Sequence, residues 1–432
     1  MLVTSLALIL LAVMGVPLFI VILASAMLGF LSAEVELTVV AIEFYRIVDM
    51  PVLVAIPLFT LAGYMLSESG ASQRLVALIQ SLLGWMPGGL AIVSLIACAF
   101  FTALTGASGV TIVALGALIY PALKQAGYGD RFSMGLITSS GSLGLLFPPS
   151  IALILYGIIA QQLNVSDPIL IDDLFLAGLL PGVLMLALLS LWSMWVDKQK
   201  NKSSAANQKT DINFSAIIKS TRDAIWEIPL PFVILGGIFS GYFAISEAAA
   251  VAVIYVFIVE VFIYRDISIR QLPDIMREAM ILVGAIIVIL GASLASTNYL
   301  IDAEVPTRLF DVIQQHIDSK ITFLLLLNIF LLVLGMMLDI FSALVIMVPI
   351  LLPIAVGYGI HPVHLGIVFL ANMQIGYFTP PIGMNLFIAS YRFKKPIIEL
   401  YLSTIPYMII LLLALIIITY WPALSLTLIS SK

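Results

Sequence analysis

The sequence predicts an all-α polytopic membrane protein, built from two inverted-topology repeats with re-entrant helical hairpins and discontinuous helices. Three observations carry this prediction: the composition, two long apolar stretches with interrupted middles, and the recurrence of the same features in both halves. Of the 432 residues, 62% are hydrophobic and 10% are charged, whereas a soluble domain is roughly 45–50% apolar and about 25% charged. This composition excludes a typical cytosolic enzyme and a disordered chain. With only 19 Lys and Arg residues, it also excludes a nucleic-acid binder.

Apolar stretches of roughly 20 residues, enough for a helix to cross a lipid bilayer, recur along the chain. Their uninterrupted character favours helices over the alternating strands of an outer-membrane barrel. The first such stretch has no basic residue before Arg46, so it is predicted to be a retained membrane segment and not a signal peptide. The predicted spans are residues 2–14, 16–32, 50–68, 131–160, 174–196, 225–244, 246–264, 280–301, 364–390 and 398–421.

Two further apolar stretches, residues 88–124 and 320–357, are each too long for one crossing. Small or polar residues interrupt them at positions 105–109 and 335–339. A re-entrant hairpin accounts for both: a helix enters the membrane, turns at mid-depth and leaves on the same side. Irregular backbone at that depth persists only where protein or a water-filled cavity surrounds it.

Two of the predicted spans contain a break at a proline pair. Pro148-Pro149 lies within residues 131–160, and Pro380-Pro381 lies within residues 364–390. Adjacent prolines remove two helix donors and clash with the preceding turn, and the glycines before them allow a helix to end. Each span is therefore predicted to consist of a half-helix, an unwound loop and a second half-helix.

The proline pairs lie 232 residues apart, and the hairpin interruptions recur at nearly the same interval. The chain is therefore predicted to contain a first repeat at residues 1–196, a polar linker at 197–224 and a second repeat at 225–432. The lysines of the linker place it in the cytoplasm by the positive-inside rule. Following the spans from there puts the N-terminus outside. The first hairpin then enters from the cytoplasm and the second from the outside, so the repeats are inverted.

Two amphipathic stretches, residues 72–83 and 306–317, precede the hairpins. They are predicted to lie at the membrane surface as arms that brace a moving part, with ordinary connecting helices as the alternative.

Inverted repeats with broken helices indicate a secondary-transport site near the bilayer midplane. Unwound loops expose carbonyl oxygens that can replace the hydration shell of a cation, and half-helix N-termini suit a carboxylate. We expect one cation site in each repeat, with a small anionic substrate between the hairpin tips. The predicted cation ligands are Gly106, Ser108, Ser139, Gly144, Pro148, Gly335, Asp339, Gly376 and Thr379. The predicted substrate-binding residues are Thr105, Ser108, Thr111, Ser140, Ser142 and Asn385.

Each of these features has an alternative explanation. One proline pair can be only a kink, and a serine at a helix–helix contact can simply pack. Asp339 is the strongest indicator, because a carboxylate in the membrane costs about 2.5–3.5 kcal/mol on insertion scales and needs a partner such as a cation. Its alternative role is that of a structural hydrogen-bond acceptor. Glu247 is expected to cap the helix that starts at Ser246, and Cys98 to be a small core residue.

Other chemistry is not expected. His361 and His364 lack a third ligand for a metal site, so no metal other than the transported cation is predicted. The chain has no phosphate-binding loop of the G-x-x-x-x-G-K-[ST] type. No Lys or Arg lies deep in a predicted span, so helix N-termini, hydroxyls and bound cations would have to hold an anionic substrate.

Five segments carry a family resemblance: residues 55–63 (AIPLFTLAG), 105–111 (TGASGVT), 140–151 (SGSLGLLFPPSI), 177–182 (AGLLPG) and 379–385 (TPPIGMN). Together they resemble the large membrane subunit of tripartite ATP-independent periplasmic (TRAP) transporters. The resemblance implies an elevator-type importer of organic acids in the bacterial inner membrane, coupled to two or more Na+ ions. It implies no enzymatic activity and no organic cofactor.

The resemblance also implies two partners, a soluble periplasmic substrate-binding protein and a small four-helix membrane subunit. No extra helices precede residue 1, so the small subunit is expected to be a separate polypeptide. The segment FAISEAAA at residues 243–250 departs from the family, which usually has Thr-Pro-Thr before the Glu. The first tip also lacks the paired serines of the sialic-acid branch, which predicts a smaller carboxylate such as a C4-dicarboxylate. The alternatives are an autonomous ion-coupled carboxylate carrier and a membrane or channel subunit without coupled transport.

Overall fold

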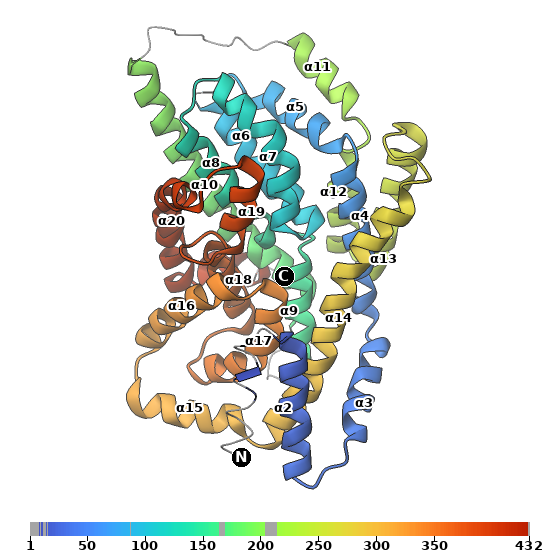
Figure 1. Ribbon diagram of the computed structural model, residues 1–432, viewed down its shortest axis with the longest axis vertical. Coiled ribbons are helices and arrows are strands. Elements are labelled where there is room, and N and C mark those ends of the chain that lie inside the picture. Colours follow the sequence, from blue (N-terminus) through green and yellow to red (C-terminus); the bar gives the residue numbers. More distant parts are fainter. Residues whose placement is uncertain are drawn as a thin grey trace.

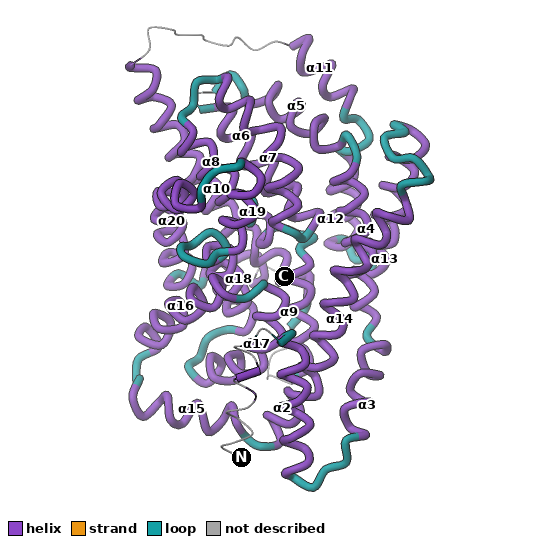
Figure 2. The backbone as a smooth tube through the Cα atoms, viewed as in Figure 1, coloured by secondary structure: helices purple, strands orange, loops and turns teal. Residues whose placement is uncertain are grey.

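The computed structural model describes residues 16–86, 88–163, 169–203 and 214–430, together with residues 8, 10, 11 and 14. Helices joined by loops make up these ranges, and no strand occurs among them (Figure 2). Most of the predicted span 2–14 lies outside the described residues.

One group of helices stands along one long side of the molecule (Figure 1). In it, α4 packs against α13 and α14, and α14 packs against α2 and α3. Large apolar side chains such as Phe232 and Ile254 are exposed on this group, as expected for helices that face lipid. The group consists of α2 (Leu18–Ser32), α3 (Thr38–Arg46), α4 (Ala55–Glu68), α12 (Pro229–Phe239), α13 (Ile245–Phe257) with its π-helical continuation Ile258–Ile263, and α14 (Leu272–Asp302). Two 3₁₀ turns, Ile47–Asp49 and Pro51–Val54, join α3 to α4.

The second group holds the hairpins and the broken helices (Figure 1). Its elements in the first half are α6 (Gly89–Thr105), α7 (Ser108–Gln125), α8 (Asp130–Ser140), the 3₁₀ turn η3 (Leu143–Leu146), α9 (Ile151–Gln162) and α10 (Ile171–Ser203). Its elements in the second half are α16 (Lys320–Met337), α17 (Ile340–Gly357), α18 (Pro362–Gly376), α19 (Met384–Phe393), α20 (Ile397–Tyr420) and α21 (Ala423–Ser430).

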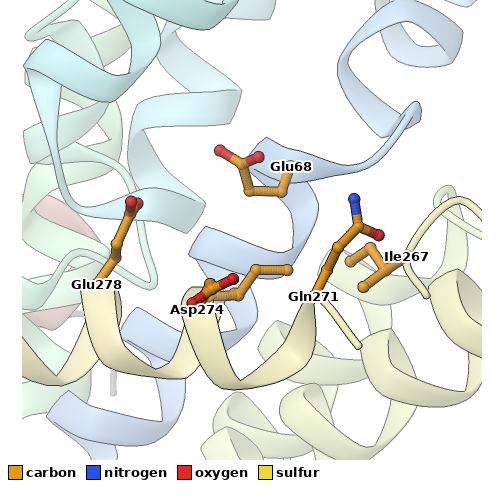
Figure 3. A pocket seen from close by; sticks show the side chains of 6 residues that line it. Glu68, Ile267, Gln271, Asp274 and Glu278 are labelled. Carbon is orange, nitrogen blue, oxygen red and sulfur yellow. The ribbon is translucent and has the colours of Figure 1, made fainter. Parts of the chain in front are cut away.

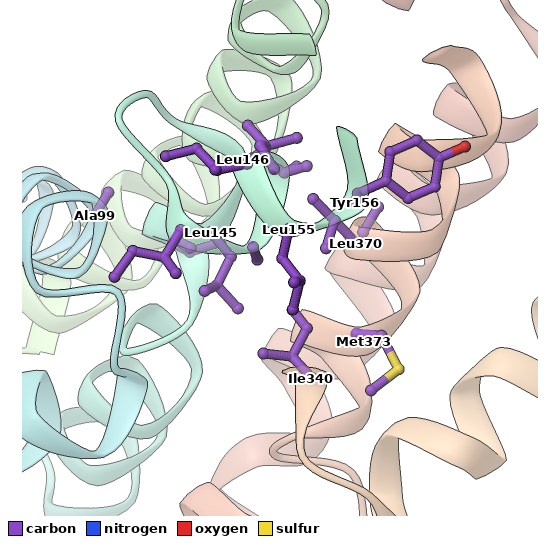
Figure 4. Packing of buried hydrophobic residues seen from close by; sticks show 14 of the residues in the cluster. Ala99, Leu145, Leu146, Leu155, Tyr156, Ile340, Leu370 and Met373 are labelled. Atoms are coloured by element: carbon purple, nitrogen blue, oxygen red, sulfur yellow. The ribbon is translucent and has the colours of Figure 1, made fainter. Parts of the chain in front are cut away.

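The two halves of the chain interleave in this second group. Helix α8 packs against α20, α7 against α19, and α9 against α17. Leu155 and Tyr156 of the first half meet Ile340 and Leu370 of the second in a common apolar core (Figure 4). Because lipid is as apolar as this core, close packing and hydrogen bonds hold it together more than the hydrophobic effect does.

The structure confirms both hairpins and both breaks. Helices α6 and α7 are separated only by Gly106 and Ala107, and α16 and α17 only by Leu338 and Asp339. The first broken helix runs through α8, η3 and α9 with a bend of 41°. The second is α18 and α19, joined by the irregular segment 377–383. The peptide bonds before Pro149 and Pro381 are cis.

Several boundaries differ from the prediction. The span predicted at 225–244 contains only the 11-residue α12, and the short helices α3 and α21 were not predicted. The linker at 197–224 is helical at both ends, because α10 continues to Ser203 and an amphipathic helix, α11 (Phe214–Asp223), follows the undescribed residues 204–213. Residue 335 was predicted in the second tip, but it lies inside α16, before the helix ends at Met337.

The two amphipathic stretches form α5 (Ala71–Leu83) and α15 (Val305–His316), which lie at opposite ends of the molecule (Figure 1). The loop between α2 and α3 lies at the same end as α15, whereas α11 lies at the end of α5. Opposite placement of the corresponding elements is the arrangement that inverted repeats predict.

Arg74 ties α5 to the first group of helices. Its guanidinium forms ion pairs with Glu227, Glu260 and Asp266 and lies 3.8 Å from the centre of the Tyr264 ring. Burial alone would lower the pKa of Arg74, but hydrogen bonds to Asp266 and Glu227 raise that pKa above its usual value. The guanidinium is therefore a permanent charge, and its three carboxylates anchor α5 at this end of the molecule.

Candidate functional site

The first hairpin tip is a tight turn that contacts the second repeat. Gly106 ends α6 with φ of 68°, in the left-handed region that favours glycine. An ideal Cβ there would lie 2.5 Å from Cδ1 of Ile151, so the turn has no room for a side chain. At the start of α7, the Ser108 hydroxyl donates a hydrogen bond of 2.8 Å to Oδ1 of Asn385, a residue of α19. The tip is thus fixed by its backbone conformation and by a contact between the two halves.

Behind this tip, Thr102 joins the hairpin to the first break. Its hydroxyl donates to the carbonyl of Gly141 at 2.8 Å and lies 2.7 Å from the hydroxyl of Thr111. Thr111 was among the predicted residues, whereas Thr102 was not. One signal was available, because Thr102 lies three residues before Thr105 and therefore on the same face of α6. Thr105 is fully buried at the end of that helix.

The serines of the first break have different surroundings. Ser139 and Ser140 lie within α8, where their hydroxyls donate to the carbonyls of Gly135 and Ile137 at 2.8 and 3.4 Å. Ser142 lies in the unwound segment, and its hydroxyl donates to the carbonyl of Gln374 at 2.8 Å. Of these three, only Ser142 donates to the second broken helix, at the last turn of α18.

Ser142 and Gln374 are related by the repeat. They are 232 residues apart, the interval that separates the two proline pairs. Equivalent positions of two inverted copies can touch only where the pseudo-two-fold axis passes, so this contact marks the axis. The two breaks therefore meet at the centre of the second helix group.

Glycines bring backbones together behind both tips. A Cβ on Gly144 would lie 2.2 Å from the carbonyl oxygen of Ala99 in α6. A Cβ on Gly376 would lie 2.7 Å from the Cα of Gly335, which is why Gly335 serves as a packing position within α16. Pro148 follows η3 in the first break, as the motif predicted.

The second tip is built around a charged side chain. Asp339 is the N-cap of α17: Oδ2 accepts the backbone N–H of Ser342 at 3.0 Å, and Oδ1 accepts the Ser342 hydroxyl. The Tyr377 hydroxyl accepts the backbone N–H of Ile340. Tyr377 was not among the predicted site residues, although it lies inside the predicted break. The carboxylate thus has the structural role that was weighed as an alternative, and it remains partly exposed.

The remaining predicted residues of the second break are held locally. The Thr379 hydroxyl donates to the carbonyl of Ile375 at 2.8 Å. The backbone N–H of Asn385 donates to the carbonyl of Tyr377 at 2.8 Å. The Asn385 side chain is fully buried against Ser108. The break is therefore a compact, hydrogen-bonded turn whose polar groups lie beside the first tip.

A cavity of about 360 Å³ lies between the two tips. Asp339 of the second tip is its charged lining residue and Ser108 of the first tip also lines it, so both tips reach one space. No Lys or Arg belongs to the lining among the described residues. The lining consists of Gly106, Ala107, Ser108, Gly109 and Val110 of the first tip, Asp339, Ile340 and Phe341 of the second, Leu145 and Tyr377 of the breaks, Met384 and Ile388 of α19, and Leu282, Ala285, Ile286 and Ile289 of α14.

The cavity thus brings together Gly106, Ser108 and Asp339 from the predicted set. Ser139, Ser140, Gly335 and Thr379 form packing or helix-internal contacts outside its lining. Three features meet here: N-termini of α7 and α17, backbone turns at mid-molecule, and one carboxylate. Such a combination can hold a cation beside an anionic group.

Inverted hairpins and broken helices around a cavity define a polytopic membrane protein of the inverted-repeat transporter class. Residues 5–424 match the family model described as "Tripartite ATP-independent periplasmic transporter, DctM component". The chain belongs to this family of TRAP transporter large membrane subunits, which confirms the resemblance carried by the five sequence segments.

Two relatives illustrate the family. The chain is 34% identical over 412 residues to the C4-dicarboxylate TRAP transporter large permease protein DctM of Rhodobacter capsulatus, covering 92% of this chain and 91% of that one. It is 33% identical to the isethionate TRAP transporter permease protein DctMQ of Oleidesulfovibrio alaskensis, covering 95% of this chain but 63% of that longer protein.

Among solved structures, the chain is similar to the Alcanivorax borkumensis YdaH transporter, whose crystal structure was described as revealing an unusual topology. The TM-score is 0.64 with 16% sequence identity, over 90% of this chain and 89% of that one. At this identity the likeness concerns the fold alone.

Proposed function

We propose that this chain is the permease that imports a small organic acid together with Na+, after a periplasmic binding protein delivers the acid. The observation that carries the proposal is the cavity between the two tips, where Ser108 and Asp339 face one space. Two relatives named for C4-dicarboxylate and isethionate transport support a small anionic acid as the substrate.

The charges around the cavity support coupling to a cation. Asp339 contributes a negative charge, and no basic side chain of the described residues lines the cavity to attract an acid. An acid alone would be repelled by Asp339, whereas an acid accompanied by Na+ would not. Na+ is held by oxygen atoms at the tips and breaks, and the N-termini of α7 and α17 face the carboxylate of the acid. Of the ligand sets predicted from the sequence, Gly106, Ser108 and Asp339 line the cavity and are the residues that its geometry supports, and the others remain proposals from the sequence.

The arrangement of the two helix groups supports an elevator mechanism. The second group carries both tips and both breaks, while α14 of the first group forms one wall of the cavity. Movement of the second group along this wall would expose the cavity on one side of the membrane and then on the other. The protein lies in a bacterial inner membrane. The end of the molecule with the linker, α5 and α11 faces the cytoplasm, and the N-terminus lies outside. A small membrane subunit completes the transporter, as the longer relative named DctMQ suggests.

Reconstitution tests the proposal. The chain, a small TRAP membrane subunit and a periplasmic substrate-binding protein are combined in proteoliposomes, and uptake of radiolabelled succinate is measured. We expect saturable uptake that requires both an inward Na+ gradient and the binding protein. Uptake by this chain alone would favour the autonomous carrier, and non-saturable flux without counterflow would favour a channel.

Asp339→Ala provides the matching variant. We expect it to abolish Na+-driven uptake while leaving the protein in the membrane, because a neutral side chain offers no charge to a cation. Sodium-dependent uptake equal to that of the unaltered protein would remove Asp339 from the mechanism.

A further inference from the structure

Two further hollows continue from the cavity between the tips. The first, of about 380 Å³, shares Gly109, Val110 and Ile388 with that cavity and is walled by Tyr64 and Ser67 of α4, among others. The second, of about 210 Å³, shares Glu68 and Glu278 with the first. Because neighbouring hollows share lining residues, the three lie in a row, and this row is called the passage below.

The passage leads to the end of the molecule that carries α5 and α11. Glu68 is the last residue of α4, and Asp274 lies in the first turn of α14 (Figure 3). In the orientation proposed above, this end is cytoplasmic. In that orientation, the row of hollows leads from the cavity toward the side on which an imported substrate leaves.

Carboxylates dominate the mouth of this passage. Glu68 from α4 and Asp274 and Glu278 from α14 surround the outermost hollow (Figure 3). No basic side chain lines any of the three hollows among the described residues. Arg74 lies near this end of α4, because Asp266 accepts from the backbone N–H of Gly70 and also pairs with the Arg74 guanidinium. That guanidinium is already neutralised by ion pairs with Glu227, Glu260 and Asp266.

None of the three carboxylates has a salt bridge within the described part of the chain. All three side chains are exposed. Unpaired charges of one sign around a concave mouth focus their field into it, since low-dielectric walls confine the field lines.

We propose that Glu68, Asp274 and Glu278 form an acidic exit vestibule that repels the organic acid and attracts the coupled cation at the inward-open mouth. The inference rests on the proposed function for its meaning in transport. The field weakens anion binding at the open site and strengthens cation binding there. The acid therefore leaves before Na+, and acid already in the cytoplasm rebinds poorly. Gradients still set the final equilibrium, because fixed charges change rates and affinities on one side only.

Thiol chemistry measures this field without any transport assay. Cys98 is the only cysteine of the chain and is fully buried, so Ser67→Cys places one accessible thiol in the passage. Purified protein in a neutral detergent is treated with a cationic trimethylammonium methanethiosulfonate or an anionic sulfonate methanethiosulfonate. We expect the cationic reagent to react faster. Combining Ser67→Cys with Glu68→Gln, Asp274→Asn and Glu278→Gln should lower the ratio of the two rates about tenfold, at the low end of field-steered rate effects.

Controls separate the field from other causes. High salt should lower the ratio in the same way, because the Debye length falls to about 3 Å at 1 M. Ser215→Cys, on the exposed surface of α11 and outside the passage, should show a ratio that the three neutral substitutions leave unchanged. An uncharged reagent, methyl methanethiosulfonate, should react at equal rates with the Ser67→Cys protein with and without them. If the uncharged reagent reacts at different rates with the two proteins, Glu278→Gln alone replaces the triple variant. The ratio of the cationic to the anionic rate is then expected to drop about threefold.

Two results would overturn the proposal. A rate ratio at Ser67→Cys that changes neither when the three carboxylates are neutralised nor when salt is added would show that the mouth has no effective field. A thiol at position 67 that reacts with none of the three reagents would show that the passage is closed. Because no substrate or gradient takes part, either result is independent of whether succinate is transported.

Discussion

The two hairpin tips occupy equivalent places in the repeats, but different chemistry holds them. The first tip is neutral: a left-handed glycine makes its turn, and Ser108 reaches across to Asn385 of the other repeat. The second tip carries the charge of Asp339, which caps its own helix and is held by Ser342. Inverted repeats therefore reproduce backbone geometry without reproducing charge. If each tip takes one Na+, only the second compensates it with a carboxylate, and the two sites should differ in affinity.

The largest expected effect follows from neutralising the second tip. Asp339→Asn keeps the shape of the side chain but removes its charge, and hydrogen bonds to charged groups are worth about 1.5–3 kcal/mol. We expect the Na+ concentration for half-maximal succinate uptake to rise by about tenfold or more, against a few-fold rise for Ser108→Ala. Asp311→Asn, on exposed α15, is the control. A larger shift from Ser108→Ala than from Asp339→Asn would reverse the comparison.

A smaller effect is expected from the glycine contacts behind the tips. Gly376→Ala would push a methyl group into the backbone of Gly335, and Gly144→Ala would push one into that of Ala99. Each should destabilise the purified protein by about 1–3 kcal/mol, the usual cost of overpacking, and lower its Tm. Gly284→Ala in α14 has no atom within 4 Å of the new methyl group, so its Tm should not fall. Equal melting of all three variants would contradict close backbone contact behind either tip.

The smallest expected effect concerns the hydrogen bond between the repeats. Ser108→Ala and Asn385→Ala each remove one partner of a buried bond, and the coupling between them should be about 0.5–1.5 kcal/mol. A double-mutant cycle on the free energy of unfolding measures it. The unequal tips predict no comparable coupling between Ser108 and Ser342, so that second pair is the matched control. Strict additivity of Ser108→Ala and Asn385→Ala would mean that the first tip is not held across the repeats.

Much of the fold was predictable because glycine and proline act locally. The proline pairs end helices wherever they occur, and the interruptions at residues 105–109 and 335–339 mark both hairpins to within a few residues. The short α3 and α21 escaped prediction because neither is a long apolar stretch that could span a membrane alone. The helical ends of the linker escaped for a similar reason, since hydropathy does not distinguish a polar surface helix from a loop.

The candidate site was less predictable than the fold. Residue type marked Ser108 and Asp339 as polar groups at mid-membrane, and the structure places both at one cavity. The roles of Ser139 and Gly335 depend on where a helix ends, which packing decides to within one turn. Tyr377 gains its role only through its contact with α17, and that contact has no local signature in the sequence. The position of Thr102 on the same face as Thr105 was visible in the sequence, but its hydrogen bond to the first break was not.

The glycine contacts also limit how the site can open. Helix α16 touches α18 backbone to backbone at Gly335 and Gly376, and the first break presses on α6 at Gly144. A hairpin that moved away from its break would lose these backbone contacts. The elevator movement proposed above keeps these contacts, because both hairpins and both breaks belong to the same helix group and would move together.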